Sequence, residues 1–227
     1  MKLNMPESDF IEIERQDIEN YLRTWFPISN FVKCAEICNY PLLDEEYQFI
    51  RNSTERRKKE FSTGRFLSRQ GLQALELPEI PIKIGRLYNP IWPEAVVGSI
   101  THDGDLCAVV ISAKTNCHAK NIGIDLVNLS NQHNNIQGLS HLFISDSSEY
   151  QIVSNFSIRI NPDLLIFSLK EAAVKAISLE INDFIDIKSI RLSEKDCSKV
   201  TVAGMTFNIK AHVAISQDYL ISAIIVK

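Results

Sequence analysis

The feature that most constrains the fold is a long-helix signal that occurs once in each half of the chain. Ser53 or Thr54 can cap a helix that runs to about Leu77, with apolar side chains along one broad face. The Asn-Pro-Asp run at 161–163 is a second start, because a cap residue, a proline in the first turn and an acid near the helix dipole all favour a helix, here one running to about Leu179. Each half of the chain is therefore expected to contain one long helix.

Short strand signals accompany each predicted helix. In the first half, residues 31–37 alternate loosely, and residues 96–100 and 106–113 predict a hairpin across a His-Asp-Gly-Asp turn. The second half has a strand at 121–127, a weak helix near 139–150, and three strands in the tail at 201–210, 211–217 and 219–227. The repeated order predicts an α+β protein of two similar lobes, each a small, mainly antiparallel sheet with a long helix.

A chain of 227 residues exceeds the commonest size of a single domain, so one large domain or two joined halves are both possible. The polar stretch at 114–121 interrupts the pattern and is the predicted junction. We therefore expect an N-terminal lobe at 1–115 and a C-terminal lobe at 116–227. A cleft at a lobe interface is a common place for a ligand.

Bulk properties exclude several classes of function. A net charge of −4 argues against a nucleic-acid-binding protein, which usually carries a strong basic excess. No segment approaches the roughly 18 uninterrupted apolar residues of a membrane span, and the first 16 residues lack the apolar core of a signal peptide. The odd number of cysteines, five, suits free thiols in a reducing compartment. We predict a cytoplasmic protein without nucleic-acid or membrane partners.

The first candidate site is the basic helix at 56–70. Arg57, Arg65 and Arg69 could face phosphates, because the guanidinium fork matches phosphate geometry. Gly64 inside this helix costs about 1 kcal/mol relative to alanine, and the close approach of another group would explain it. A solvated basic face accounts for the same residues.

Two further segments carry candidate residues. His102 stands where a strand enters a tight turn, and it can bind a phosphate or support the turn. Asp125 on a strand and Glu171 on a helix could hold Mg²⁺, which prefers one or two carboxylates, retained waters and phosphate oxygens. Glu171 and Lys175 lie four residues apart on one helix face, so an exposed ion pair worth a few tenths of a kcal/mol remains an alternative.

Together these segments match one family in order and spacing. The chain resembles the 4′-phosphopantetheinyl transferase superfamily, and it is most similar to the Sfp-type branch typified by enterobactin synthase component D. The matching motifs are R-x-x-E-F-x-x-G-R at 57–65, W-P at 92–93, G-S-I-T-H at 98–102, G-I-D at 123–125 and F-S-x-K-E-A-x-x-K-A at 167–176.

The resemblance implies a monomer of two pseudo-symmetric lobes that binds coenzyme A and Mg²⁺ in the cleft between them. Arg57, Arg65 and His102 would hold the 3′-phosphate of coenzyme A and nearby parts of the molecule. Asp125 and Glu171 would bind the metal.

The implied reaction moves 4′-phosphopantetheine from coenzyme A to a serine of an apo acyl or peptidyl carrier protein, in siderophore or other secondary-metabolite synthesis. Lys170 and Lys175 would contact the pyrophosphate. Glu171 and Lys175 would be the catalytic residues, with Glu171 as the base for the serine.

One position departs from the family pattern, which often has a second acid two residues after the aspartate. Val127 stands there and cannot bind a metal. An impaired relative that binds coenzyme A or a carrier protein without transfer is therefore an alternative. A basic-helix nucleic-acid binder is a weaker third, which the acidic net charge opposes.

Overall fold

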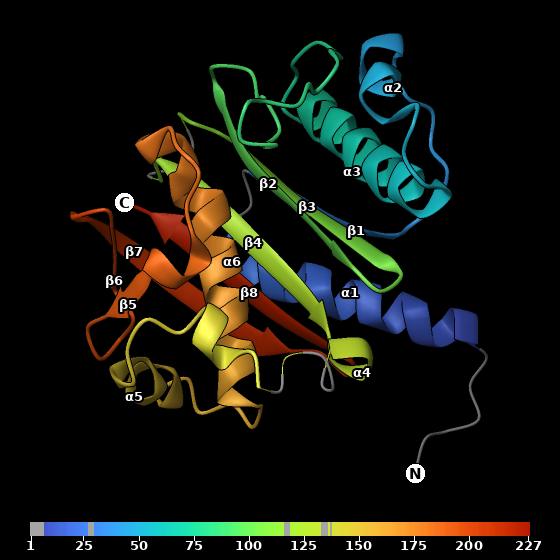
Figure 1. Cartoon of the computed structure of the whole chain (residues 1–227). Helices are drawn as coiled ribbons and strands as arrows, with labels where there is room; N and C mark the ends of the chain where they lie inside the picture. Colours follow the sequence, from blue (N-terminus) through green and yellow to red (C-terminus); the bar gives the residue numbers. More distant parts are fainter. Residues whose placement is uncertain (1–6, 27–29, 116–118, 133–135, 137) are drawn as a thin grey trace.

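The computed structural model describes residues 7–26, 30–115, 119–132, 136 and 138–227. The described strands form two antiparallel sheets, one in each lobe, which confirms the predicted α+β class (Figure 1). The three-stranded sheet has the order β1-β3-β2 and the five-stranded sheet the order β4-β8-β7-β6-β5. The strands are β1 (Asn30–Glu36), β2 (Val96–Asp103), β3 (Leu106–Ala113), β4 (Asn121–Asn128), β5 (Arg191–Ser193), β6 (Lys199–Val202), β7 (Met205–Ile215) and β8 (Tyr219–Val226).

Two helices flank the first sheet, one on each face (Figure 1). The predicted long helix is α3 (Glu55–Ala74), and its cap is Thr54, whose side chain accepts a hydrogen bond from the Arg57 backbone nitrogen at 3.3 Å. On the opposite face lies α1 (Glu7–Trp25), which the sequence pattern did not predict. The short α2 (Asp44–Ile50) was also missed and packs beside α3.

The second sheet packs against α6 (Pro162–Ile181), the other predicted long helix. Asn161 caps it by accepting a hydrogen bond from the Asp163 nitrogen at 2.9 Å, and Pro162 occupies the first turn as predicted. The helix ends at Asn182, which takes a left-handed conformation. Shorter elements of this lobe are α4 (Leu129–Gln132), α5 (Ser148–Ser154) and the 3₁₀ turns η1 (Ser140–Leu142) and η2 (Ile187–Ser189).

Two predictions in the second half were wrong. The helix expected near 139–150 is a 3₁₀ turn followed by α5, which begins only at Ser148. Residues 211–217 do not begin a separate strand, because β7 runs unbroken from Met205 to Ile215. The turn lies earlier, at Ala203 and Gly204, where both residues have positive φ.

A glycine sets the distance between α6 and its sheet. A Cβ atom on Gly123 of β4 would lie 2.0 Å from the Ala172 carbonyl oxygen and 2.8 Å from the Ala176 nitrogen, both in α6. Any larger residue would therefore push helix and strand apart. The glycine of the G-I-D motif thus allows close contact between α6 and the strand that carries Asp125.

Each lobe contains a buried glutamate that joins a short helix to the long one. In the first lobe, Glu46 of α2 accepts hydrogen bonds from the Leu43 and Ile82 nitrogens, at 3.1 and 3.0 Å, and pairs with Arg69 of α3. In the second, Glu149 of α5 accepts from the Ser145 and Leu192 nitrogens, at 3.0 and 2.9 Å, and pairs with Lys170 of α6. The same device occurs in both lobes.

The two sheets meet along β2 and β4, a contact that we call the interlobe seam. Three alternate side chains of β2 accept hydrogen bonds from backbone nitrogens of β4: Ser99 from Ile124 at 3.0 Å, Thr101 from Leu126 at 3.1 Å and Asp103 from Asn128 at 2.7 Å. Edge N–H groups that would otherwise be buried without partners are thereby satisfied. Side chains, not a backbone ladder, thus hold the lobes in register.

Helix α1 contributes to a core that both lobes share. Ile18 and Leu22 pack in one apolar cluster with Val110 of β3, Ile124 of β4 and Ala223 of β8. The Glu14 carboxylate of the same helix accepts hydrogen bonds from the Ser216 hydroxyl at 2.5 Å and the Asp218 nitrogen at 2.7 Å, at the turn between β7 and β8. An N-terminal element therefore covers part of the C-terminal sheet.

The thiols Cys34, Cys38, Cys107 and Cys197 are free, while Cys117 lies outside the described residues, within the predicted junction at 114–121. Burial raises the pKa of Cys107 and of Cys197 to about 12, so both stay protonated at neutral pH. Among the described helices, none combines the length and apolar character needed to cross a bilayer.

Candidate functional site

A pocket opens where the two lobes meet, and residues of both lobes line it. The basic part of its wall comes from α3 and β2, which carry Arg57, Arg65 and His102. Val174 and Lys175 of α6 close it from the other lobe. The remaining wall is largely apolar and comes from the loop between α3 and β2, with Ile84, Leu87, Tyr88, Pro90 and Trp92. A basic and partly apolar pocket of this kind suits a phosphorylated organic ligand.

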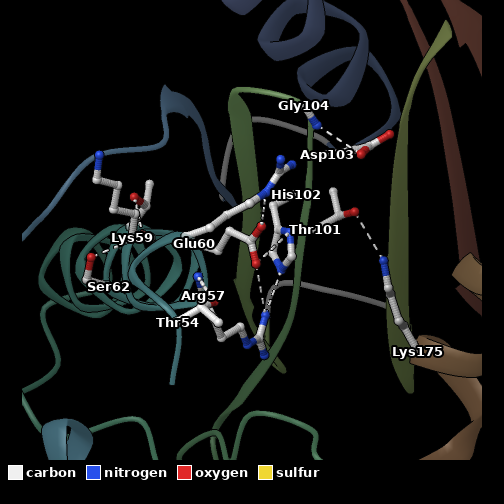
Figure 2. A network of polar contacts seen from close by, with 12 residues as sticks. Thr54, Arg57, Lys59, Glu60, Ser62, Thr101, His102, Asp103, Gly104 and Lys175 are labelled. Atoms are coloured by element: carbon white, nitrogen blue, oxygen red, sulfur yellow. Dashed lines mark hydrogen bonds and ion pairs between the residues drawn. The ribbon is translucent and has the colours of Figure 1, made fainter. Parts of the chain in front are cut away.

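Arg57, Glu60 and His102 form a contact network at the pocket (Figure 2). Arg57 Nη1 lies 3.1 Å from His102 Nε2 and 3.4 Å from Glu60 Oε2. A guanidinium has no acceptor, so Nε2 must accept and the proton of a neutral ring resides on Nδ1, which is 3.9 Å from Glu60 Oε2. Glu60 belongs to the sequence motif, yet sequence analysis gave it no role.

Burial lowers the pKa of His102 below its usual range; Glu60 opposes this shift, and Arg57 and Lys175 reinforce it. The ring is therefore neutral at neutral pH. A phosphate placed beside it would favour the protonated form by opposite charge. Arg57 and His102 are thus brought together, as two residues of one candidate phosphate site.

Arg65 also lines the pocket but is more deeply held. Its guanidinium carbon lies 4.3 Å from the centre of the Phe61 ring, and its Nε donates to the Ile82 carbonyl at 2.6 Å. Burial lowers its pKa to about 10, which leaves it charged at neutral pH. Arg69, the third arginine of the basic helix, instead pairs with Glu46 and Glu79 away from this pocket. The nearby Gly64 allows close approach of Ile100, whose Cγ2 would lie 3.0 Å from an added Cβ.

On the other lobe, Lys175 links Asp125 to the pocket. Its ammonium group donates to Asp125 Oδ1 at 2.8 Å, to the Ile124 carbonyl at 2.9 Å and to Thr101 Oγ1 at 3.1 Å. The second carboxylate oxygen of Asp125 accepts from the Ser168 hydroxyl at 2.9 Å. The aspartate is therefore held on both oxygens.

Glu171 lies one helical turn before Lys175 and is half-buried. Burial raises its pKa, the charge of Asp125 raises it further, and Lys175 opposes both. The Asp125 and Glu171 carboxylates are thus near enough to repel one another. Within the described residues no group of three or more His, Cys, Asp or Glu side chains could hold a metal. Two carboxylates still fit Mg²⁺, because this ion usually keeps several waters and takes substrate phosphates as ligands.

One sequence candidate, Lys170, does not join this group, and Val127 stands where the family often has an acid. Lys170 is fully buried, and its ammonium group contacts Glu149 Oε2 at 2.9 Å, the Phe143 carbonyl at 2.7 Å and Ser145 Oγ at 2.9 Å. Val127 lies on the same face of β4 as Asp125, but it packs in the apolar cluster around α6. The Lys170 side chain therefore points into the core of the second lobe, and residue 127 offers no side chain that could bind a metal.

Sequence analysis missed the hydroxyl of Thr101, which contacts both Lys175 and β4. The only signal was its place in the G-S-I-T-H motif, where every second residue turns out to face β4. Sequence analysis also gave no role to Trp92. Its ring packs so closely on Gly98 that a Cβ atom added there would lie 2.8 Å from it.

Comparisons with known proteins agree with this geometry. Residues 45–112 match the 4′-phosphopantetheinyl transferase N-terminal domain, and residues 121–224 match the 4′-phosphopantetheinyl transferase superfamily. The chain is 30% identical over 149 residues to the 4′-phosphopantetheinyl transferase Npt of Nocardia iowensis, covering 64% of each protein. It is 32% identical to the transferase Svp of Streptomyces mobaraensis, covering 60% of the chain and 54% of Svp. It is 29% identical to enterobactin synthase component D of Escherichia coli K12, covering 69% of the chain and 73% of that protein.

The chain thus spans about half to two thirds of the length of most of these curated relatives. The two family models lie side by side, one in each lobe, and together they take in nearly all of the residues described above as the site. The chain belongs to the 4′-phosphopantetheinyl transferase superfamily.

Proposed function

We propose that this protein transfers the 4′-phosphopantetheine moiety of coenzyme A to a serine of an apo carrier protein and releases 3′,5′-ADP. The observation that carries the proposal is the interlobe pocket, where Arg57 and His102 of one lobe face Lys175 of the other, with Asp125 bound to that lysine. Family membership and the names of the relatives support the same activity. Relatives named enterobactin synthase component D favour a carrier protein of siderophore synthesis as the partner.

In this proposal each lobe binds a different part of the coenzyme A and Mg²⁺ complex. The N-terminal lobe, residues 1–115, holds the 3′-phosphate of coenzyme A with Arg57, Arg65 and His102. The C-terminal lobe, residues 116–227, binds Mg²⁺ with Asp125 and Glu171. The protein acts as a cytoplasmic monomer, and Lys170 is assigned to its buried ion pair and not to the pyrophosphate.

The transfer exchanges one P–O bond for another. The carrier serine oxygen bonds to the β-phosphorus, and the bond from that phosphorus to the bridging oxygen breaks, so the electron pair leaves with 3′,5′-ADP. Glu171 takes the serine proton, directly or through a water. The positive charge of Lys175 stabilises the pyrophosphate oxygens on which negative charge grows. When bound, Mg²⁺ would neutralise charge on the same oxygens and align them for in-line displacement.

One measurement tests the proposal. Apo acyl and peptidyl carrier proteins are incubated with this protein, coenzyme A and Mg²⁺, and their intact masses are determined. We expect at least one carrier to gain a single phosphopantetheine, and its serine-to-alanine variant to gain none. Coenzyme A binding by calorimetry without a mass gain on any carrier would instead favour the binding-module alternative, which the apolar Val127 suggested.

The phosphate role of His102 gives a second expected result. His102→Gln should weaken coenzyme A binding by roughly tenfold or more, because it removes a charge-assisted contact worth about 1.5–3 kcal/mol. It should leave the affinity for 3′-dephospho-coenzyme A nearly unchanged. Arg57→Gln should show the same selectivity. Isothermal titration with both ligands measures it, and equal losses for the two would mean that neither side chain contacts the 3′-phosphate.

A further inference from the structure

Thr101 occupies the point where the two halves of the proposed site meet. It follows Ile100 and precedes His102 on β2, and its hydroxyl oxygen accepts hydrogen bonds from the Leu126 nitrogen and from Lys175 Nζ, each at 3.1 Å. Figure 2 shows the lysine reaching from α6 to this oxygen. This buried hydroxyl thus contacts both the backbone of Leu126, the residue that follows Asp125 on β4, and the lysine that pairs with Asp125.

The contact fixes the direction of the lysine. An ammonium group has three hydrogens, and those of Lys175 are used by Asp125, the Ile124 carbonyl and Thr101. Two of these acceptors belong to β4. Thr101 is the acceptor that comes from the N-terminal lobe, so it ties the charge of Lys175 to the strand that carries His102.

The plain alternative is that Thr101 only supplies one of the three side-chain hydrogen bonds of the interlobe seam. Asp103 offers the comparison, because its carboxylate accepts from the Asn128 nitrogen at 2.7 Å and, within its own turn, from the Gly104 nitrogen at 2.9 Å. Among the described residues, the acceptors of Lys175 are Asp125, Ile124 and Thr101, and Asp103 is not one of them. If only the seam mattered, loss of the Thr101 hydrogen bond and loss of the Asp103 hydrogen bond would have the same effect on catalysis. Contact with the lysine is what distinguishes Thr101.

We propose that Thr101 is a positioning residue for transfer, which holds Lys175 where negative charge develops in the transition state and keeps β4 in register with His102. The inference rests on the proposed function. Charge stabilisation of this kind depends on groups that are fixed before the reaction. Loss of the hydroxyl should therefore lower kcat more than it raises KM for coenzyme A.

The test compares Thr101→Val, which keeps the shape and removes the hydroxyl, with Thr101→Ser, which keeps the hydroxyl, and with Asp103→Ala. We expect kcat to fall roughly 10–100-fold in Thr101→Val, the size of effect that is typical of outer-shell residues that orient the ligands of a metal site. KM for coenzyme A should change by less than about threefold, and Thr101→Ser should restore kcat. Asp103→Ala should keep kcat near that of the unaltered protein. Should Thr101→Val not fold, Thr101→Cys gives the same comparison, because sulfur is a weak acceptor.

Hydrogen exchange supplies a readout that is independent of activity. The Leu126 amide should lose protection in Thr101→Val, and the Asn128 amide should lose it in Asp103→Ala. An unchanged kcat in folded Thr101→Val, or an equal loss in Asp103→Ala, would overturn the positioning role while the proposed function stands. If the unaltered protein modifies no carrier, the proposed function fails and the role of Thr101 in transfer fails with it.

Discussion

Replacing Glu171 by glutamine is expected to reduce phosphopantetheine transfer by roughly 10²–10⁴-fold, the usual range for removing a general base. The amide keeps the size of the side chain but loses both its negative charge and its capacity to take the serine proton. Asp125→Asn should produce a loss of similar size, because it removes the negative charge of the carboxylate that lies 2.8 Å from Lys175 Nζ. Initial rates at saturating coenzyme A and Mg²⁺ measure both effects.

The matched control is Glu180→Gln, the same change on the same helix. Glu180 is exposed and accepts a hydrogen bond from Asn121 Nδ2 at 2.6 Å, outside the pocket. The transfer rate of the Glu180→Gln variant should stay within about twofold of that of the unaltered protein, as expected for a surface change with no role at the site. Folded Glu171→Gln and Asp125→Asn variants with full activity would show that the two carboxylates are not at the reacting centre.

The second large effect concerns stability. Lys170→Met should lower the free energy of unfolding by about 3–5 kcal/mol, because it leaves the buried Glu149 carboxylate without its cation. Both side chains of this pair have 0% exposure, and their charged atoms are 2.9 Å apart. Urea denaturation followed by circular dichroism measures the loss.

An exposed pair in the same lobe serves as the comparison. Lys199 Nζ and Glu194 Oε1 are 3.1 Å apart, but their side chains are 42% and 52% exposed. Lys199→Met should therefore change stability by less than about 1 kcal/mol. Similar small effects at both positions would contradict the assigned role of Lys170. A stable Lys170→Met variant with weakened coenzyme A binding would instead indicate that Lys170 contacts the pyrophosphate.

The long helices were predictable because their start signals are local. Thr54 and Asn161 cap α3 and α6, as the sequence indicates. Helix α1 has no comparable signal at its start. Its apolar positions, such as Ile18 and Leu22, pack in one cluster with the neighbouring β1 and also with the distant strands β3, β4 and β8. The continuity of β7 likewise depends on its pairing with β8 from Ile209 to Ile215, which no local pattern reports.

The candidate site was predictable in part. The motif spacing places Asp125, Glu171 and Lys175 together, because Glu171 and Lys175 share a helix face. The same periodicity separates Lys170 from Lys175 by about 140° around the helix axis, so the turn of Lys170 toward Glu149 could have been anticipated. The seam could not, since hydrogen bonds from Ser99, Thr101 and Asp103 to β4 exist only once two distant strands lie side by side.

The position of α1 has a consequence for engineering this protein. A cut between the lobes near residue 115 would leave the fragment that carries Asp125 without Ile18 and Leu22, and would leave Ser216 without its partner Glu14. The lobes are thus not interchangeable modules, and a chimaera that takes its second lobe from a relative must also take the matching first helix. The unit of exchange is discontinuous in sequence.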